Sequence, residues 1–499
     1  MTWRDPTQVR STAFALAVVL ACALTWSVLP AILLSAPHGD NVEQLNWSQA
    51  FQWGYFKHPP LPTWLLRGAI DVFGASAGLT YALAMACVAV ALILVWLCAR
   101  QLMQPREALI ALLVSSANYY LMGRGSFLNH NTVMLPFVAL TAWAVLRIVR
   151  GAGWTMWLLL GLGQALGLLT KYQMGLIILA NGAALLAAGA HRQPRFGAHL
   201  MLASVATLVP LIPHALWLAD HQFATFEYAG HSLLADLNVA RRLSACASFL
   251  GQQLARLAPA LLALVFLTVS MRRPAEARSS EATSTREEQT KIEIRALTVL
   301  ALTPLAAIVV LVLIAGVAPQ NHWGATSTLL IPLLWVSRLR AKARLSVRAA
   351  CMATALCHAG AIAWNVAVWK VDPGPHHRFA ARALAAQAQQ HWSSHQSGPI
   401  RLVIGPDWEA GSIALYLPEH PAVLPNADWR QAPWIDRDLL SRCGALIIAR
   451  TNVPLEQQLP LPEIANVSDP TILEATDELG RESTIQAALI GGAPANACR

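Results

Sequence analysis

The chain has 499 residues, of which 56% are hydrophobic and 13% are charged, and its formal net charge is +9. Ordinary soluble domains are about a quarter charged. The charges here are also clustered and leave long apolar runs between them, which excludes a soluble globular protein. Positive charge in membrane proteins gathers in cytoplasmic loops, so the net charge does not imply nucleic-acid binding.

The apolar runs predict a polytopic membrane protein, because a bilayer core needs roughly 20 apolar residues per helix. We expect about eleven spans, at residues 11–36, 77–99, 107–122, 131–149, 154–170, 173–190, 199–219, 246–270, 296–317, 325–337 and 348–370. The first run follows a short basic start, and its length favours an uncleaved anchor over a cleaved signal peptide. Several later spans are short, and the ends of such helices need surrounding protein or a water-filled cavity.

Basic residues gather in alternate loops between these spans. With eleven spans, the loops that hold Arg100, Arg147, Arg192 and the segment 271–295 all lie on the side of the N-terminus. Basic loops face the cytoplasm, so we expect a cytoplasmic N-terminus in a bacterial inner membrane. The odd span count then places the C-terminal part outside. The segment 271–295 is rich in Ser, Thr, Glu and Arg, which predicts a disordered cytoplasmic linker.

The chain divides into a transmembrane domain, residues 1–370, and a soluble periplasmic domain, residues 371–499. Residues 376–396 suit an amphipathic helix, residues 409–417 look like a helix start, and residues 400–404 and 445–449 look like short buried strands, which together predict a small α/β domain. Of the eight cysteines, which show no metal-ligand spacing, Cys443 and Cys498 fall in this domain. They could form a disulfide in an oxidising compartment.

A long external loop, residues 37–76, separates the first two clear spans. Val42, Leu45 and Trp47 suit a helix at the membrane surface that starts near Asp40. Asp40 is then either the N-cap of this helix or a carboxylate that accepts a proton from an attacking hydroxyl. Glu43 similarly completes a capping box or acts as a second acid.

This loop and three later segments together form a set of motifs. They are Asp40…Trp47-Ser48…Trp53-Gly54-Tyr55…Lys57-His58-Pro59-Pro60-Leu61…Trp64, then Gly167-Leu168-Leu169-Thr170-Lys171-Tyr172, Asn321-His322-Trp323-Gly324 and Ala432-Pro433-Trp434. The set resembles bacterial protein-mannosyltransferase-type enzymes, glycosyltransferase family 39, which includes the lipid A aminoarabinose transferase.

The resemblance implies a GT-C fold, in which a transmembrane bundle carries a periplasmic domain, and a polyprenyl-phosphate-linked sugar as donor. It implies that Asp40 is the catalytic carboxylate and that Lys57 and Lys171 contact the donor phosphate. Relatives carry Glu directly after the first Asp, where this chain has Asn41. The second external loop of relatives carries an acidic residue, whereas this loop contains none.

The remaining candidates line the same predicted cavity, and each has a plain structural alternative. A lysine at the depth of the membrane is costly unless it faces a polar cavity or an anion. We therefore expect Lys171 to bind the phosphate, together with Lys57 and with Arg124, Arg241 or Arg242. Lys57 is otherwise an interfacial lysine, and the paired arginines otherwise cap a span. Further candidates for contacts with the substrate are Tyr55, His58, His130, Asn131, His322 and Trp323. His130 is otherwise a structural histidine at a helix start, and Trp323 an interfacial belt residue.

Three classes of function fit these features. The first is a membrane glycosyltransferase that uses a polyprenyl-phosphate sugar, inverts the anomeric carbon and modifies an envelope lipid, glycan or protein. The second is a transporter or flippase of lipid-linked sugars, which is usually marked by internal repeats; we find none. The third is a scaffold protein, which needs no basic residues at membrane depth. Dependence on a divalent metal stays open, because the sequence shows no convincing ligand cluster.

Overall fold

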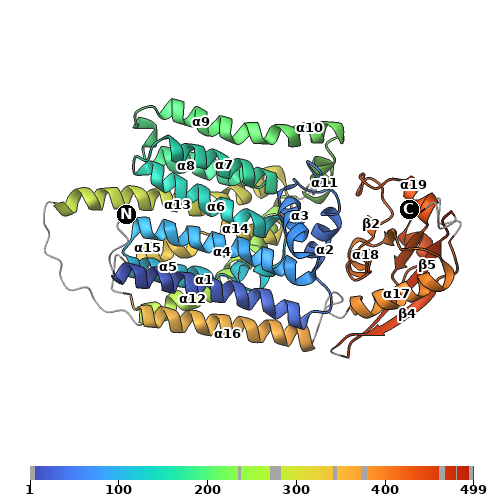
Figure 1. The fold of residues 1–499 in the computed structure, drawn as a ribbon. Helices are drawn as coiled ribbons and strands as arrows, with labels where there is room; N and C mark the ends of the chain where they lie inside the picture. The colour runs from blue at the N-terminus through green and yellow to red at the C-terminus, as the bar shows by residue number, and fades with distance from the viewer. Residues whose placement is uncertain are drawn as a thin grey trace.

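The computed structural model describes residues 6–233, 238–269, 282–340, 345–371, 379–459, 467–478, 480–493 and 498. A helical bundle is followed by a smaller domain built on a sheet (Figure 1). The larger helices of the bundle are α1 Pro6–Leu33, α2 Gly39–Trp47, α3 Leu61–Phe73, α4 Ala77–Leu102, α5 Pro105–Ser116, α6 His130–Val149, α7 Trp154–Thr170, α8 Met174–Ala187, α9 Phe196–Leu208, α10 Ile212–Asp220, α11 Ala224–Leu233, α12 Val239–Val269, α13 Ala282–Ala315, α15 Ile331–Leu339 and α16 Val347–Val371. Short helices between them are η1 Tyr119–Leu121, η2 Gly123–Ser126, η3 Ala190–Arg192, η4 Val209–Leu211, η5 Asn321–Trp323 and α14 Gly324–Ser327.

The predicted polytopic membrane bundle is confirmed. Among the described residues, seven helical stretches are long and apolar enough to cross a membrane. These stretches are Arg10–Leu33, Ala77–Leu102, His130–Val149, Phe196–Asp220, Val239–Val269, Glu287–Ala315 and Val347–Lys370. The other four of the eleven predicted spans also coincide with helices, namely α5, α7, α8 and α15, but these are shorter than a full crossing.

Ion pairs and carbonyl contacts join the helix ends far from the C-terminal domain, which we call the basic end. Arg150 pairs with Glu293 of α13, and Arg340 pairs with Glu107 at 3.0 Å. The prediction of a disordered linker at 271–295 is therefore wrong for residues 282–295, which belong to α13. Their Glu, Gln, Lys and Arg residues are good helix formers, and the helix buries Glu293 against Arg150. Residues 270–281 lie outside the described part of the chain.

The C-terminal domain contains a five-stranded sheet in the order β2-β1-β3-β5-β4. Its elements are α17 Ala381–His395, β1 Leu402–Gly405, α18 Asp407–Ala414, β2 Ala422–Pro425, α19 Asp438–Cys443, β3 Ala445–Ala449, α20 Leu455–Gln458, β4 Thr471–Thr476 and β5 Glu482–Ile490. Strands β2, β1 and β3 are parallel, and β5 pairs antiparallel with β3 and β4.

Both faces of this sheet are covered, so its central strands are apolar throughout. Val403 points into one apolar cluster and Ile404 into the other, as the alternation along a strand requires. The predicted α/β domain and its two strands are confirmed. The predicted helix 376–396 begins at Ala381, and residues 372–378 lie outside the described part. Cys443 and Cys498 form a disulfide, with 4.9 Å between their Cα atoms.

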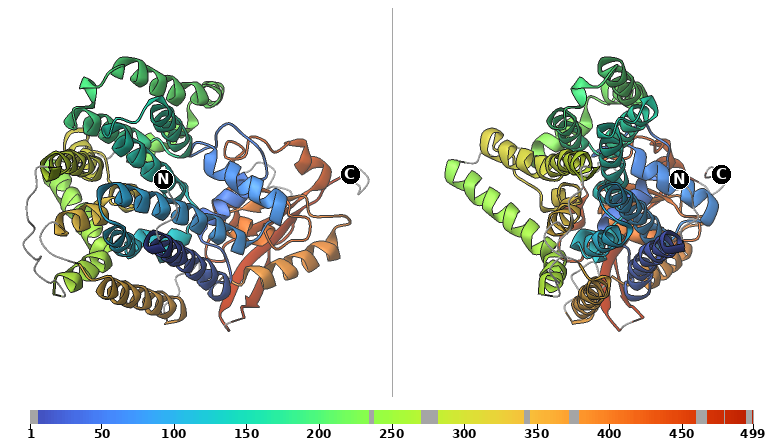
Figure 2. Two further views of the ribbon diagram at one scale, coloured as in Figure 1. Left: turned by 60° about the vertical axis from the view of Figure 1, so that its left-hand side comes forward. Right: turned by 90° about the vertical axis from the view of Figure 1, so that its left-hand side faces the viewer.

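The C-terminal domain docks on the bundle through α2, which lies between them (Figures 1 and 2). Helix α18 approaches α2 so closely that a Cβ at Gly411 would lie 2.5 Å from atoms of Val42 and Asn46. The Trp408 indole donates to the Pro37 carbonyl at 2.9 Å, and Asn46 donates to the Asp407 side chain at 2.8 Å. These contacts fix the first external loop against the C-terminal domain.

A second contact holds the far edge of the domain. Arg481 pairs with Asp477 in the turn between β4 and β5, and its guanidinium also donates to Ser35 at 2.6 Å and to the Trp369 carbonyl at 3.3 Å. Both charged side chains are almost fully buried, at 12% and 2% exposed. This buried ion pair therefore joins the chain after α1, the end of α16 and the sheet.

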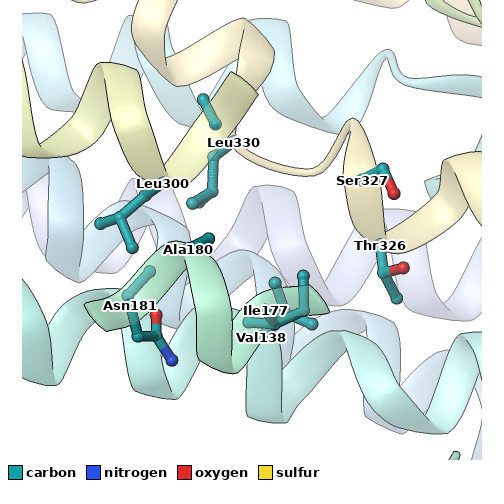
Figure 3. Close-up of a pocket in the computed structure, with 10 residues that line it drawn as sticks. Val138, Ile177, Ala180, Asn181, Leu300, Thr326, Ser327 and Leu330 are labelled. Carbon is teal, nitrogen blue, oxygen red and sulfur yellow. The ribbon is translucent and has the colours of Figure 1, made fainter. Parts of the chain in front are cut away.

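The interior of the bundle between α6, α8, α13 and α15 is closely packed. A cavity of about 10 Å³ lies there, lined by Val138, Ile177, Asn181, Leu300 and Leu330 among others (Figure 3). A cavity of that size holds at most one water molecule. It is too small for a substrate.

Removal of the Arg481 guanidinium should strongly destabilise the docked domain. Because Arg481→Met removes the countercharge of the buried Asp477 carboxylate, we expect a loss of about 3 kcal/mol in the free energy of unfolding. Denaturant unfolding of the purified protein, followed by tryptophan fluorescence, measures this change. The matched control is Arg442→Met, which breaks the exposed Arg442–Asp436 pair and should cost less than about 1 kcal/mol. Equal effects of the two substitutions would contradict the docking role.

Candidate active site

Helix α2 presents two carboxylates on one face. Its N-cap is His38, whose side chain makes no capping hydrogen bond. Asp40 lies in the first turn with an exposed side chain, where the helix dipole favours a negative charge. Glu43 follows three residues later, so both acids face the same side. The alternative reading of Asp40 as an N-cap is therefore wrong, and so is the capping box, because Glu43 pairs with Lys57 instead.

The second external loop holds Asp40. Asn129 donates from Nδ2 to Asp40 Oδ2 at 2.7 Å. The side-chain oxygen of Asn129 accepts from the backbone N–H groups of Asn131 and Thr132 at 2.9 and 3.0 Å, so Asn129 is the N-cap of α6. The residue that orients the carboxylate is thus itself fixed by a helix start.

Asn41, which stands where relatives carry a second acid, is fully buried and has a structural role. It donates to Thr80 Oγ1 at 2.8 Å and accepts from the Leu128 backbone N–H at 3.1 Å. These bonds join α2 to α4 and to the loop before α6. Asn41 therefore holds helix α2, which carries Asp40, at a fixed distance from the loop that carries Asn129.

Lys171 lies in the turn between α7 and α8 and contacts the start of α6, directly after the second external loop. Its Nζ donates to Asn131 Oδ1 at 2.7 Å. Burial lowers the pKa of Lys171 to about 7, and the negative charge of Asp40 opposes this shift. The structure therefore brings Asp40, Lys171 and Asn131 together from three distant parts of the chain.

Lys57 faces the two acids on its other side. It forms an ion pair with Glu43, and it also interacts electrostatically with Asp407 at the start of α18. Burial raises the pKa of Glu43 above its ordinary value, although Lys57 opposes the shift. Burial likewise raises the pKa of Asp407. Asp407 is a site residue that sequence reasoning missed, because a single acid in a soluble domain has no distinguishing pattern.

Aromatic rings form the floor beside Lys57. The rings of His58 and His130 lie 4.0 Å apart, and Trp47 meets both of them edge-on. Burial, together with His130 and the neighbouring lysines, lowers the pKa of His58 well below its ordinary value, so its imidazole is neutral. Tyr55 is buried, stacks on Trp47 at 5.2 Å and donates to the Ala50 carbonyl.

Further cations gather around His322 in η5. Burial and the charges of Lys171, Arg124 and Arg256 lower the pKa of His322 to about 3, so this imidazole is also neutral. The Arg124 guanidinium lies 4.1 Å from the Phe127 ring centroid. Arg256 was missed by sequence reasoning. The signal was an arginine inside an apolar span, which is by default a functional residue.

Two predicted candidates lie elsewhere. Arg242 donates to the carbonyls of Leu313 and Ile314 at the end of α13, so it caps that helix, as its structural reading predicted. Trp323 is buried in an apolar cluster with Phe249 and Ile308. Its backbone carbonyl accepts from Gln173 at 3.1 Å, which fixes η5 against the turn that carries Lys171.

Among the described residues, no group of three or more His, Cys, Asp or Glu side chains is arranged to hold a metal ion. The chemistry that the protein side chains themselves support is that of an exposed carboxylate opposite a set of cations. Such a site can accept a proton on one side and stabilise a departing anion on the other.

Part of the chain matches a known protein family. Residues 57–217 match the profile of the dolichyl-phosphate-mannose-protein mannosyltransferase family. Over 208 residues the chain is 26% identical to the lipopolysaccharide core galacturonosyltransferase RgtA of Rhizobium johnstonii, a match that covers 40% of this chain and 41% of that protein. The chain therefore aligns with less than half of that relative.

The fold is similar to that of ArnT from Cupriavidus metallidurans. The crystal structure of ArnT bound to undecaprenyl phosphate superposes with a TM-score of 0.61 at 14% identity, over 94% of this chain and 97% of that one. The apo structure gives a TM-score of 0.57 at 13% identity, over 95% and 98%. The fold expected from the sequence motifs, a GT-C bundle with a small C-terminal sheet domain, is confirmed.

The Glu43–Lys57 pair can be tested by a double-mutant cycle. Lys57→Met leaves Glu43 shielded and unpaired, so we expect a loss of about 1–3 kcal/mol in the free energy of unfolding. The double variant Glu43→Gln/Lys57→Met should recover most of that loss, because neither charge remains. Denaturant unfolding of the four proteins gives the coupling. Additive effects of the two substitutions would contradict the ion pair.

Proposed function

We propose that the protein is an integral membrane glycosyltransferase that moves a sugar from a polyprenyl-phosphate donor to a cell-envelope acceptor. One observation carries this proposal: Asp40 and Lys171, 131 positions apart, are held at one loop by Asn129 and Asn131, and Arg124 and Arg256 act together with Lys171 on His322. A transporter of lipid-linked sugars needs no such exposed carboxylate opposite a phosphate site.

The cations stabilise the leaving group. As the bond between the anomeric carbon and the phosphate oxygen breaks, negative charge grows on the phosphate, and positive groups already in place stabilise that charge. Lys171, Arg124 and Arg256 supply this positive charge. Among the described residues, none of the three forms an ion pair that would neutralise it. Lys57 is held by Glu43, so its positive charge is partly balanced before a donor binds.

Asp40 acts on the acceptor. Its carboxylate takes the proton of the acceptor hydroxyl as the oxygen forms a bond to the anomeric carbon, on the face opposite to the departing phosphate. A single displacement of this kind inverts the anomeric centre. Asn129 holds the carboxylate in one orientation, and the exposed side chain leaves its second oxygen accessible to the acceptor.

The orientation in the membrane follows from charge. Arg100, Arg150, Arg338 and Arg340 lie at the basic end, and such residues face the cytoplasm. The site and the C-terminal domain then face the periplasm from a bacterial inner membrane. The Cys443–Cys498 disulfide suits that oxidising compartment.

The acceptor class is supported by the relatives. One relative is named as a lipopolysaccharide core galacturonosyltransferase, and the solved ArnT structure holds undecaprenyl phosphate. We infer an envelope glycolipid or glycan as acceptor and an undecaprenyl-type phosphate as carrier. The transferred sugar is a hexosyl or pentosyl group.

Asp40→Asn should abolish transfer without unfolding the protein. The amide keeps the shape and the exposed position of the side chain but cannot take a proton, so we expect kcat to fall about 10²–10⁴-fold with little change in the donor KM. Mass spectrometry of envelope glycolipids from a deletion strain and from complemented strains should show the loss of one glycosyl increment in both the deletion and the Asp40→Asn strain. The control Asp71→Asn changes an exposed acid on neighbouring α3, and a strain complemented with it should carry the glycosyl increment. Full modification by the Asp40→Asn strain would refute the role of Asp40.

Donor affinity should fall as the pH rises. Only protonated Lys171 attracts the phosphate, and its pKa is lowered to about 7. The donor is a phosphodiester with constant charge, so its KM should rise about tenfold between pH 6 and pH 8 as the lysine loses its proton. Lys171→Arg should remove this dependence because a guanidinium stays charged over the whole range. The same slope in both proteins would show that another group is responsible.

A further inference from the structure

A second cavity adjoins the candidate active site, where the bundle meets the C-terminal domain. Its volume is about 340 Å³, which is within the size range of small-ligand sites. Tyr55 and Trp217 line it from the bundle, and Trp429 and Trp434 line it from the C-terminal domain. In Figure 1 the helices that contribute, α10 and α11, lie at the bundle end that faces this domain.

Four large aromatic side chains dominate the walls. Tyr55 and Trp434 meet edge-on at 5.7 Å, and Trp217 is packed so closely on Gly54 that a Cβ there would lie 2.3 Å from its ring. The rings of Tyr55 and Trp217 are buried and fixed, whereas those of Trp429 and Trp434 are partly exposed. Flat, rigid, amphipathic surfaces of this kind suit a ligand with an apolar face and a polar edge.

The polar groups around the cavity balance each other. Asp220 and Glu227 come from the bundle side, and Arg430 and Arg437 come from the domain side. Arg437 lies over the Trp429 ring at 5.6 Å. Two acids and two arginines together favour a ligand that is rich in hydroxyl groups over a polyanion. A pyranose ring has this combination, because its C–H face stacks on aromatic rings and its hydroxyl edge binds carboxylates and guanidinium groups.

The cavity shares a wall with the catalytic residues. Tyr55 stacks on Trp47, which in turn contacts His58 and His130. Phe56 also lines the cavity and precedes Lys57 in the chain. Trp47 and His130 connect Tyr55 to the loop of Asn131, the partner of Lys171. Lys171, Arg124 and Arg256 are not among the residues that line the cavity, so a saccharide bound there is not the sugar on the donor phosphate.

We propose that this cavity binds a saccharide ring of the acceptor, so that the acceptor is recognised as a glycan and not as a peptide. This inference rests on the proposed function for the role of acceptor, but the binding of a saccharide can be tested without transfer. Stacking of this ring on Trp429 or Trp434 would hold the acceptor beside Tyr55 and Phe56, which precede Lys57 in the chain.

The test is saturation-transfer NMR on the full-length protein in nanodiscs free of glycoside detergents, since sugar head groups would compete. The probes are methyl hexopyranosides, maltotriose and a decapeptide that contains Ser and Thr. We expect saturation of the ring protons of the saccharides with the wild type. Trp429→Leu and Asp220→Asn should reduce it several-fold, whereas Trp429→Phe should retain most of it. The control Trp154→Leu removes an exposed tryptophan at the basic end and should have no effect. Thermal unfolding of each variant identifies any that fail to fold.

A kinetic measurement separates the two possible sources of the saccharide. With the acceptor glycan identified by mass spectrometry, Trp429→Leu should raise the acceptor KM about tenfold, the effect expected for loss of a stacking ring. The donor KM should stay within twofold. A raised donor KM alone, saccharide signals that do not change in the variants, or saturation of the peptide alone would each overturn the inference. If the wild type binds saccharide but transfers none, the proposed function fails and the saccharide site stands.

Discussion

The site depends on one buried amide. Asn41 uses its side-chain donor and acceptor on Thr80 and on the backbone at Leu128, and it has no exposure to solvent. A buried amide that loses a partner pays the full desolvation penalty of the unpaired group, so these bonds hold the first external loop at a fixed position over the bundle. That position lets Asn129 reach Asp40. The neighbouring Asn131 then reaches Lys171.

Charge is distributed unevenly across the site, and the distribution has a physical reason. On one side, Lys57 is paired with Glu43 and lies near Asp407, so carboxylates balance its positive charge inside the protein. On the other side, Lys171 and Arg256 are not balanced by an ion pair in the described structure, which is expensive near membrane depth. Such positive charge is stable only where an anion or water reaches it. The uneven distribution thus supports the proposed phosphate site.

The sequence alone predicted the bundle well, since each predicted span coincides with a helix. Lys171 was predicted as a site residue because a lysine between two apolar segments needs an anion, and the same reasoning applied to span 246–270 points to Arg256. The position of Asp407 was beyond this reasoning, because it depends on how closely α18 packs on α2, which Gly411 permits. The linker at 271–295 was partly wrong because polar composition alone does not separate a solvated helix from a disordered segment.

The cavity between the bundle and the sheet domain takes its walls from two parts of the chain that are distant in sequence. The cations of the proposed phosphate site all come from the bundle, whereas Trp429, Trp434 and Asp407 come from the C-terminal domain. Substitutions in the C-terminal wall can therefore change what the cavity accepts while the bundle cations stay the same. Such changes at Trp429 or Trp434 would be one route by which a single membrane scaffold diversifies the surface of a cell.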